Sequence, residues 1–291
     1  MPQERGVCLK FNYVRFPGGK AKAFTLSYDD GVIQDRLLIE RMEACGIRGT
    51  FNLNSGQYPP PGTVPEPGQW HIRLSRDEAT QLYQRPGIEV AVHGRMHAHI
   101  GELSQALITR ELLQDREALE SQFGVIVNGA CYPYSCWNAK IRLASQACGI
   151  EFARGGICSG GFSLPEDWLQ WAPTCHHTDP DLPGLTQRFL DGKPERDPML
   201  FFVWGHAYEF DRDHSWDVIE TLLQAVCRRP DVWYATNGEI YAYLSACEQL
   251  RYSCDGSLVY NPTCVPVYLR VDYRDVVIQP GERLRLPHVD L

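Results

Sequence analysis

Two adjacent aspartates, Asp29 and Asp30, stand between an apolar run and a glycine in the stretch FTLSYDDG, residues 24–31. Aspartate and glycine are frequent in turns, so a polar turn is one explanation of this pair. Neighbouring carboxylates repel each other, however, and a structural role seldom needs both of them. The choice between a turn and a reactive site depends on which other polar groups the fold brings beside them.

Histidines and a further carboxylate occur in two other segments that begin as apolar strands. His93 and His97 stand four residues apart in VAVHGRMHAHI, and His206 precedes Glu209 in VWGHAYEFD. Two imidazoles at this spacing can face one ion when the turn between them is helical. With one aspartate they would leave coordination positions open for water and substrate, which is typical of catalytic rather than structural metal sites. One carboxylate of the aspartate pair would then bind the ion and the other would accept a proton from water. The sequence does not say which of the two aspartates has which role.

Strand-like and helix-like segments alternate before residue 248, which predicts parallel strands wrapped by helices. We expect strands at 21–28, 46–54, 87–94, 125–134, 150–156, 198–206 and 232–236, with a further candidate around 168–175. We expect helices at 33–45, after Ser75, and at 104–123, 139–148, 184–192, 215–228 and 237–247. About seven strand–helix units favour an α/β barrel that is closed or nearly closed. Its strand ends would bring the polar clusters to one mouth.

The pattern changes to short strands and turns from Gln249 onward, in SLVYNP, VPVYLRVDY and VVIQPGERLRL. We therefore predict a barrel domain over residues 1–248 and an accessory β tail, packed on the barrel, over residues 249–291. The long segment between Gly56 and Gly68 is rich in proline and glycine and is expected to be a loop.

The net charge is −8 and no long run of lysine and arginine occurs, which argues against nucleic acid or an anionic membrane as the main partner. The longest apolar run, Met199 to Trp204, is far too short to span a bilayer. The first residues lack the apolar core of a signal peptide, and the 11 cysteines include no C-x-x-C pair. We expect reduced thiols and a cytoplasmic location, although a chain whose leader had been removed would look the same.

At these residues the chain resembles the polysaccharide deacetylases of the NodB-homology type, carbohydrate esterase family 4, over roughly residues 20–247. The resemblance is carried by SYDDG, HGRMH, CYPYS and the late WGH. The last continues as W-G-H-A-Y-E, as in a subgroup with W-G-H-x-Y-E. The resemblance implies a distorted, incomplete (β/α)7 barrel, to which the small C-terminal β extension is added.

The resemblance also implies the roles of the polar residues. Asp30, His93 and His97 would bind a divalent metal ion, with Zn²⁺ as the first expectation. Asp29 would be the general base that activates water, and His206 would be the general acid that protonates the leaving amine.

Further roles follow from the same resemblance and from neighbouring residues. The backbone N–H of Tyr134 would stabilise the oxyanion. Glu209 could orient His206 and raise its pKa, or it could serve the start of a helix. Trp204 could line a pocket for the acetyl methyl group, or it could belong to the core.

The chain departs from the family pattern at two positions. Gly94 stands where serine or threonine is usual, and Cys131 stands where the family has an arginine that pairs with the catalytic aspartate. We expect Arg154, at the end of the next strand, to replace that arginine, because a guanidinium can hold a carboxylate and keep it ionised. A surface arginine is the alternative.

We expect from this a hydrolase that removes N-acetyl groups from amino sugars of an oligo- or polysaccharide. A metal-dependent amidohydrolase acting on a small non-sugar amide is one alternative, and a catalytically silent sugar-binding barrel is another. Tyr58 and Trp70, which bracket the proline-rich loop, could form one wall of a sugar groove. His176 and His177 could touch substrate, whereas His99 is expected to point away from the ion.

Overall fold

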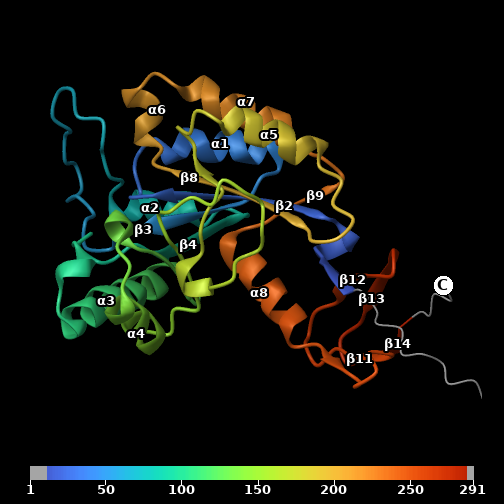
Figure 1. The fold of residues 1–291 in the computed structure, drawn as a ribbon. Coiled ribbons are helices and arrows are strands. Elements are labelled where there is room, and N and C mark those ends of the chain that lie inside the picture. Colours follow the sequence, from blue (N-terminus) through green and yellow to red (C-terminus); the bar gives the residue numbers. More distant parts are fainter. Residues whose placement is uncertain (1–11, 287–291) are drawn as a thin grey trace, which may run out of the picture.

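A computed structural model describes residues 12–286, and its centre is a curled sheet of parallel strands (Figure 1). The strand order is β6-β5-β4-β3-β2-β8-β7, and β9 also pairs with β2. The strands are β2 (Lys22–Asp29), β3 (Gly49–Leu53), β4 (Ile88–Val92), β5 (Gly129–Cys131), β6 (Phe152–Arg154), β7 (Cys175–His176), β8 (Met199–Gly205) and β9 (Val232–Tyr234). β6 and β7 form no ladder with each other within this described part, where a single bridge joins Arg154 to Trp171. The expected incomplete (β/α)7 barrel is therefore confirmed.

Helices cover the sheet on its outside (Figure 1). They are α1 (Asp35–Cys45), α2 (Arg76–Tyr83), α3 (Gln105–Phe123), α4 (Ala139–Ala147), α5 (Leu182–Asp191), α6 (Tyr208–Arg212), α7 (Trp216–Val226) and α8 (Asn237–Glu248). α7 packs between α1 and α5, and α3 packs against α4. None of the helices between residues 12 and 286 combines the length and the apolar character that a membrane crossing requires.

The ends of three helices show how the sequence sets these boundaries. Ser75 begins α2 and Thr236 begins α8 with a capping box, in which the hydroxyl accepts from the backbone N–H three residues on and a glutamate returns the bond. α1 ends at Gly46, whose φ of 68° is the left-handed conformation that glycine adopts without cost. These helices match the sequence-based expectation, whereas the short helix α6 was not expected.

The central strand β2 positions the aspartate pair. All eight of its residues are buried, and it is paired with β3 on one side and with β8 on the other. Phe24 and Phe201 meet across the β2–β8 pair with their ring centroids 5.5 Å apart. A strand buried on both faces and paired on both edges has little freedom, so the end of β2 is a rigid place for Asp29.

Two expected strands are shorter than the sequence suggested. The strand predicted at 125–134 is reduced to β5, because the chain turns at Pro133 into a 3₁₀ turn, Pro133–Ser135. The candidate strand at 168–175 is a 3₁₀ turn, Trp168–Gln170, followed by an irregular stretch and the two residues of β7.

The chain after α8 forms two small antiparallel sheets. Their strands are β10 (Arg251–Tyr252), β11 (Leu258–Tyr260), β12 (Val267–Val271), β13 (Arg274–Ile278) and β14 (Arg283–Arg285), together with β1 (Asn12–Arg15), which pairs with β12. Val267 and Leu269 of β12 share an apolar core with Phe16, Phe202 and other barrel residues. The strands of the tail were expected, but the pairing with β1 was not. The division into domains at residue 248 stays a prediction.

Candidate active site

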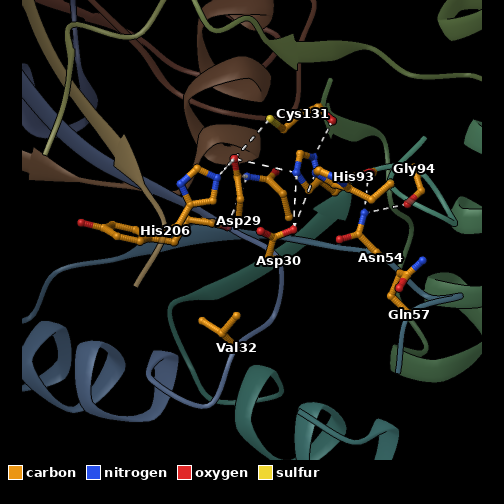
Figure 2. Close-up of polar contacts among 12 residues, drawn as sticks. Asp29, Asp30, Val32, Asn54, Gln57, His93, Gly94, Cys131 and His206 are labelled. Carbon is orange, nitrogen blue, oxygen red and sulfur yellow. Dashed lines mark hydrogen bonds and ion pairs between the residues drawn. The ribbon is translucent and has the colours of Figure 1, made fainter. Parts of the chain in front are cut away.

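Polar side chains from different strands gather at the carboxyl end of the sheet (Figure 2). Asp29 is the last residue of β2, His93 directly follows β4, Arg154 ends β6 and His206 directly follows β8. Figure 2 shows Asp29 and Asp30 between the imidazoles of His93 and His206. The parallel sheet thus brings together residues that lie up to 177 positions apart in the sequence, which is the convergence that the strand-end pattern predicted.

Asp29 is buried, and both of its carboxylate oxygens have partners. Asn52 Nδ2 donates to Oδ1 at 2.7 Å, and a guanidinium nitrogen of Arg154 donates to Oδ2. The guanidinium of Arg154 also lies 4.1 Å from the ring of Trp204. Burial raises the pKa of Asp29, but the charge of Arg154, together with His93 and His206, outweighs burial and lowers it. The expected pairing of Arg154 with Asp29 is present, and Asp29 is held as a carboxylate.

Asp30, His93 and His97 form a group whose ligand atoms lie within 4.8 Å of one another. Nε2 of His93 and Nε2 of His97 lie 3.9 and 3.7 Å from Asp30 Oδ1, too far for hydrogen bonds. Ligands bound at about 2.0–2.2 Å to a tetrahedral ion lie about 3.3–3.6 Å apart, so the spacing is close to that of a coordination site.

The state of the two imidazoles also suits a metal. His93 Nδ1 lies 2.9 Å from the carbonyl oxygen of Cys131, which fixes its proton there and leaves the lone pair of Nε2 facing Asp30. Burial lowers the pKa of His93, and burial together with the neighbouring His93 lowers that of His97 to about 4. Both rings are therefore neutral, as metal ligands must be. The donor set fits a divalent cation.

A second combination of ligand atoms, from Asp29, His93 and Cys131, is also close enough for an ion. It fits less well because the guanidinium of Arg154 contacts two of its three ligand atoms, Asp29 Oδ2 and, at 2.7 Å, Cys131 Sγ, whereas in the Asp30 group a guanidinium, that of Arg73, contacts only Asp30 Oδ1. Burial raises the pKa of Cys131 well above its usual value, so the thiol keeps its proton. We therefore assign the ion-binding geometry to the Asp30 group.

Two residues that contact Asp30 were not predicted from the sequence. Arg73 Nη2 donates to Asp30 Oδ1 at 2.9 Å, and His71 Nε2 lies 3.0 Å from Asp30 Oδ2. Burial raises the pKa of Asp30, but the hydrogen bond from His71 and the charges of His93 and Arg73 lower it well below its usual range. The signal in the sequence was H-I-R at the end of the proline-rich loop, where alternate residues of an extended segment share a face.

The backbone at this end of the sheet adopts unusual conformations. Asp30 has φ 81° and His97 has φ 50°, both in the left-handed region that non-glycine residues rarely occupy. Gly94 has φ 73°, and an added Cβ would lie 3.2 Å from Pro133 Cγ. Glycine at this position, where the family motif has serine or threonine, is therefore explained by the backbone. Such strain persists where the surroundings impose it, and it clusters at functional sites.

Two polar side chains hold the loop that carries the histidines. Asn54 Nδ2 donates to the carbonyl oxygens of His93 and Gly94 at 2.6 and 2.7 Å (Figure 2). Asp115, buried on α3, accepts from the backbone N–H groups of Ser55 and His93 at 2.7 and 3.1 Å. Neither residue was predicted, because their contacts are made with backbone atoms far away in the sequence.

His206 faces Asp29 from the other side, with Nε2 at 3.8 Å from Asp29 Oδ2. Its other nitrogen, Nδ1, lies 3.4 Å from Glu209 Oε2, so Glu209 is placed to orient the ring. Burial lowers the pKa of His206, but Glu209 and Asp29 outweigh burial and raise it. Nε2 of His176 and of His177 each lie 3.3 Å from the same oxygen of Glu209. The two histidines therefore contact the acid candidate through Glu209.

Of the remaining candidates, Tyr134 lines the opening. Tyr134 has φ 56° in the turn after Pro133, and its exposed ring stacks on His99 with centroids 3.6 Å apart. A cleft of about 450 Å³ lies between the proline-rich loop and this turn, lined by Gln57, Pro59, Thr63, Pro65, Gln69, His71, Ile72, Arg73, Met96, His97 and Tyr134. Trp70 is exposed but is not part of this lining, and Tyr58 is largely buried against the apolar core.

Comparison with known proteins relates part of the chain to a family and its fold to solved structures. A family model described as polysaccharide deacetylase matches residues 12–153. No curated protein matches the chain. Among solved structures, a Mycobacterium smegmatis protein described as a candidate polysaccharide deacetylase has 16% identity and a TM-score of 0.55, over 81% of this chain and 94% of that one. The Xyl-CE4 domain of a multidomain xylanase from the hindgut metagenome of Trinervitermes trinervoides has 15% identity and a TM-score of 0.50, over 77% and 92%.

These two likenesses show the fold. A third structure, the Streptococcus pyogenes deacetylase PplD in complex with acetate, aligns over only 45% of this chain and 55% of its own length, with 16% identity and a TM-score of 0.39. The family match includes Asp29, Asp30, His93 and His97, and the curled parallel sheet agrees with it. Residues 12–153 therefore match the polysaccharide deacetylase family, and the fold of the chain agrees with that match.

Proposed function

We propose that the chain is a metal-dependent hydrolase that removes N-acetyl groups from the amino sugars of an oligo- or polysaccharide. The observation that supports this most is the convergence of Asp30, His93 and His97 beside a second, separately held carboxylate, Asp29. In this proposal the first three residues hold a divalent cation, with Zn²⁺ as the first candidate because two imidazoles and one carboxylate suit it.

A bound cation would make water more acidic and would polarise the acetyl carbonyl. Asp29 Oδ2 accepts the proton of the attacking water while Arg154 keeps the carboxylate ionised and in place. Nε2 of His206, 3.8 Å from Asp29 on the opposite side, donates a proton to the leaving nitrogen. The new bond joins the water oxygen to the acetyl carbon, the C–N bond breaks, and acetate and the free amine leave. The backbone N–H of Tyr134 is proposed as an oxyanion donor.

A small non-sugar amide is the second candidate substrate. The cleft beside His97 has a volume of about 450 Å³ and is lined by several polar side chains, including Gln57, Gln69 and Arg73. Small-molecule sites have volumes in this range. A third possibility, a silent sugar-binding barrel, would require loss of the base or of a metal ligand, and both are retained.

Acetate release from N-acetylglucosamine oligomers, measured beside a panel of small amides and with metal analysis, tests the proposal. We expect release that requires metal and falls at least about 100-fold in Asp29→Asn, because a general base contributes about 10²–10⁴ to the rate. The same variant should keep its metal. Full activity of Asp29→Asn would contradict the base assignment. Turnover of small amides alone would favour the second candidate.

A further inference from the structure

Glu209 lies at the start of α6 with three imidazoles around one of its oxygens. Oε2 lies 3.3 Å from Nε2 of His176, 3.3 Å from Nε2 of His177 and 3.4 Å from Nδ1 of His206. The other oxygen, Glu209 Oε1, lies 3.6 Å from Arg212 Nη2. The three histidines therefore share Oε2. His177 is 1% exposed, whereas the other members of the cluster are half-buried near the mouth.

Two arrangements could account for this cluster. A cation could bind His176, His206 and Glu209, whose ligand atoms lie within 4.8 Å of one another. The distances from Oε2 also equal the edges of a tetrahedron around an ion with bonds of about 2.0–2.1 Å. Alternatively, the carboxylate oxygen could accept N–H bonds from all three rings. The nitrogens that face away from Glu209 distinguish the two arrangements, because a ligating histidine donates its other N–H to a partner.

Those nitrogens favour hydrogen bonding. The backbone N–H of Thr178 donates to His176 Nδ1 at 3.2 Å, so this nitrogen is an acceptor and the proton of the neutral ring is on Nε2. His177 Nδ1 is buried and has no hydrogen-bond partner in the described structure. Metal binding at Nε2 would put a proton on that Nδ1 and leave a buried donor unpaired, which is costly.

The neighbouring residue Gly205 explains why His177 cannot turn away. A Cβ on Gly205 would lie 1.9 Å from His177 Nδ1, so the imidazole occupies the space that a side chain would need. The ring of His177 stacks on Tyr28 at 5.7 Å and packs against Phe210 at 4.2 Å, between ring centroids. The glycine in W-G-H and the histidine pair at 176–177 are therefore parts of one packing arrangement.

We propose that His176 and His177 are positioning residues that fix Glu209 Oε2, and that Glu209 thereby holds His206 with Nε2 directed at Asp29. The three ring nitrogens lie 3.3–3.4 Å from Oε2. None of these contacts is aligned as a hydrogen bond, and Oε2, His177 Nε2 and His206 Nδ1 have no other hydrogen-bond partner in the described structure, so a small rotation of the rings toward Oε2 is what satisfies them. The fixed carboxylate selects the ring orientation that places the proton-donating nitrogen of His206 at the reacting bond. This inference rests on the proposed role of His206 as general acid.

A double-mutant cycle tests the inference. His177→Phe and His176→Phe keep an aromatic ring and remove the donor, and each should lower kcat about 10- to 100-fold with KM within twofold, since hydrogen bonds to charged groups have this range of strength. In a Glu209→Gln background the same changes should cost no further kcat, because residues that act through one carboxylate are not additive. His177→Gln should keep most activity, since its amide can place a donor near the position of Nε2. If the fold-loss of kcat in each double variant equalled the product of the two single fold-losses, the proposal would be overturned.

A second readout does not need activity. The Nδ1 proton of His206, observed by NMR, should be protected from exchange in the wild type and in His177→Gln, and unprotected in His177→Phe, His176→Phe and Glu209→Gln. His214→Phe, at an exposed histidine outside the cluster, is the matched control and should leave the proton protected. Should His177→Phe not fold, the half-buried His176 carries the same comparison.

The outcomes separate this inference from the proposed function. The chain could release no acetate while the Nδ1 proton of His206 is protected in the wild type and loses its protection in His176→Phe and His177→Phe. That result would support the positioning role and refute the deacetylase assignment. Activity with an Nδ1 proton that is indifferent to His176 and His177 would do the reverse. Two zinc ions per chain, one of them lost in His176→Phe, would replace the proposal by a second metal site.

Discussion

The pair formed by Arg154 and Asp29 yields a prediction with a defined dependence on pH. Both residues are buried, and replacing one partner of such a pair leaves an uncompensated charge that costs about 3–5 kcal/mol. In Arg154→Met the penalty is limited because Asp29 can take up a proton. From an ordinary pKa of about 3.9, protonation costs about 4 kcal/mol at pH 7 and about 1.5 kcal/mol at pH 5.

The sign of this dependence differs between the two proteins. In the wild type the pKa of Asp29 is lowered, so its contribution is complete above pH 4 and is lost only as the pH falls through the native pKa. In Arg154→Met burial dominates and the carboxyl stays protonated above pH 4. The difference in free energy of unfolding between the wild type and Arg154→Met should therefore shrink by about 2.5 kcal/mol as the pH falls from 7 to 5.

Urea unfolding at several pH values measures this difference, with Arg41→Met as the control, because Arg41 forms an exposed pair with Glu220 that contributes about 1 kcal/mol or less. A destabilisation of Arg154→Met that stays constant from pH 7 to pH 5 would refute the reasoning. Cys131 is the register partner of Arg154 on β5, so the exchange Cys131→Arg with Arg154→Cys should restore a guanidinium beside Asp29 and recover activity.

Three further predictions follow from single contacts. Gly205→Ala should lower the free energy of unfolding by several kcal/mol, since its Cβ would lie 1.9 Å from His177 Nδ1 and the surroundings are packed; a melting temperature equal to that of the wild type would contradict this. Burial raises the pKa of Asp35 to about 8, so the folded state binds a proton more tightly than the unfolded state and stability falls as pH rises from 4 to 8. Asp35→Asn, which can still accept from Tyr83, should remove this loss and be about 5 kcal/mol more stable at pH 8 than the wild type, as measured by urea unfolding; an unchanged dependence of stability on pH would contradict this. His97→Ala should lose tightly bound zinc in metal analysis, and an unchanged zinc content would exclude His97 as a ligand.

The sequence allowed the fold to be predicted because its strands are apolar and its helices carry clear ends. β2, β4 and β8 are recognisable as apolar runs, and their ends carry the polar residues that the sheet gathers. The pairing of β1 with β12 could not be predicted, since strand partners that lie between 253 (Arg15 and Tyr268) and 259 (Asn12 and Val271) positions apart leave no local pattern.

The site was predictable where it depends on spacing and not where it depends on tertiary contacts. Arg154 was predicted because it ends the strand that follows Cys131, where the resemblance puts an arginine, and the register then places the two residues side by side. His71 and Arg73 were missed because the loop that carries them gives no strand or helix from which a direction could be derived. The meeting of His177 with Glu209 was missed for a related reason, since β7 has only two residues and α6 only five.

Zinc titration of Asp29→Asn against Asp30→Asn measures whether the two adjacent aspartates have different tasks. One zinc ion should bind to Asp29→Asn with an affinity near that of the wild type, while Asp30→Asn should bind at least about 10-fold more weakly, because it loses an anionic ligand. Equal zinc affinities in the two variants, or loss of zinc from Asp29→Asn alone, would contradict the division of tasks.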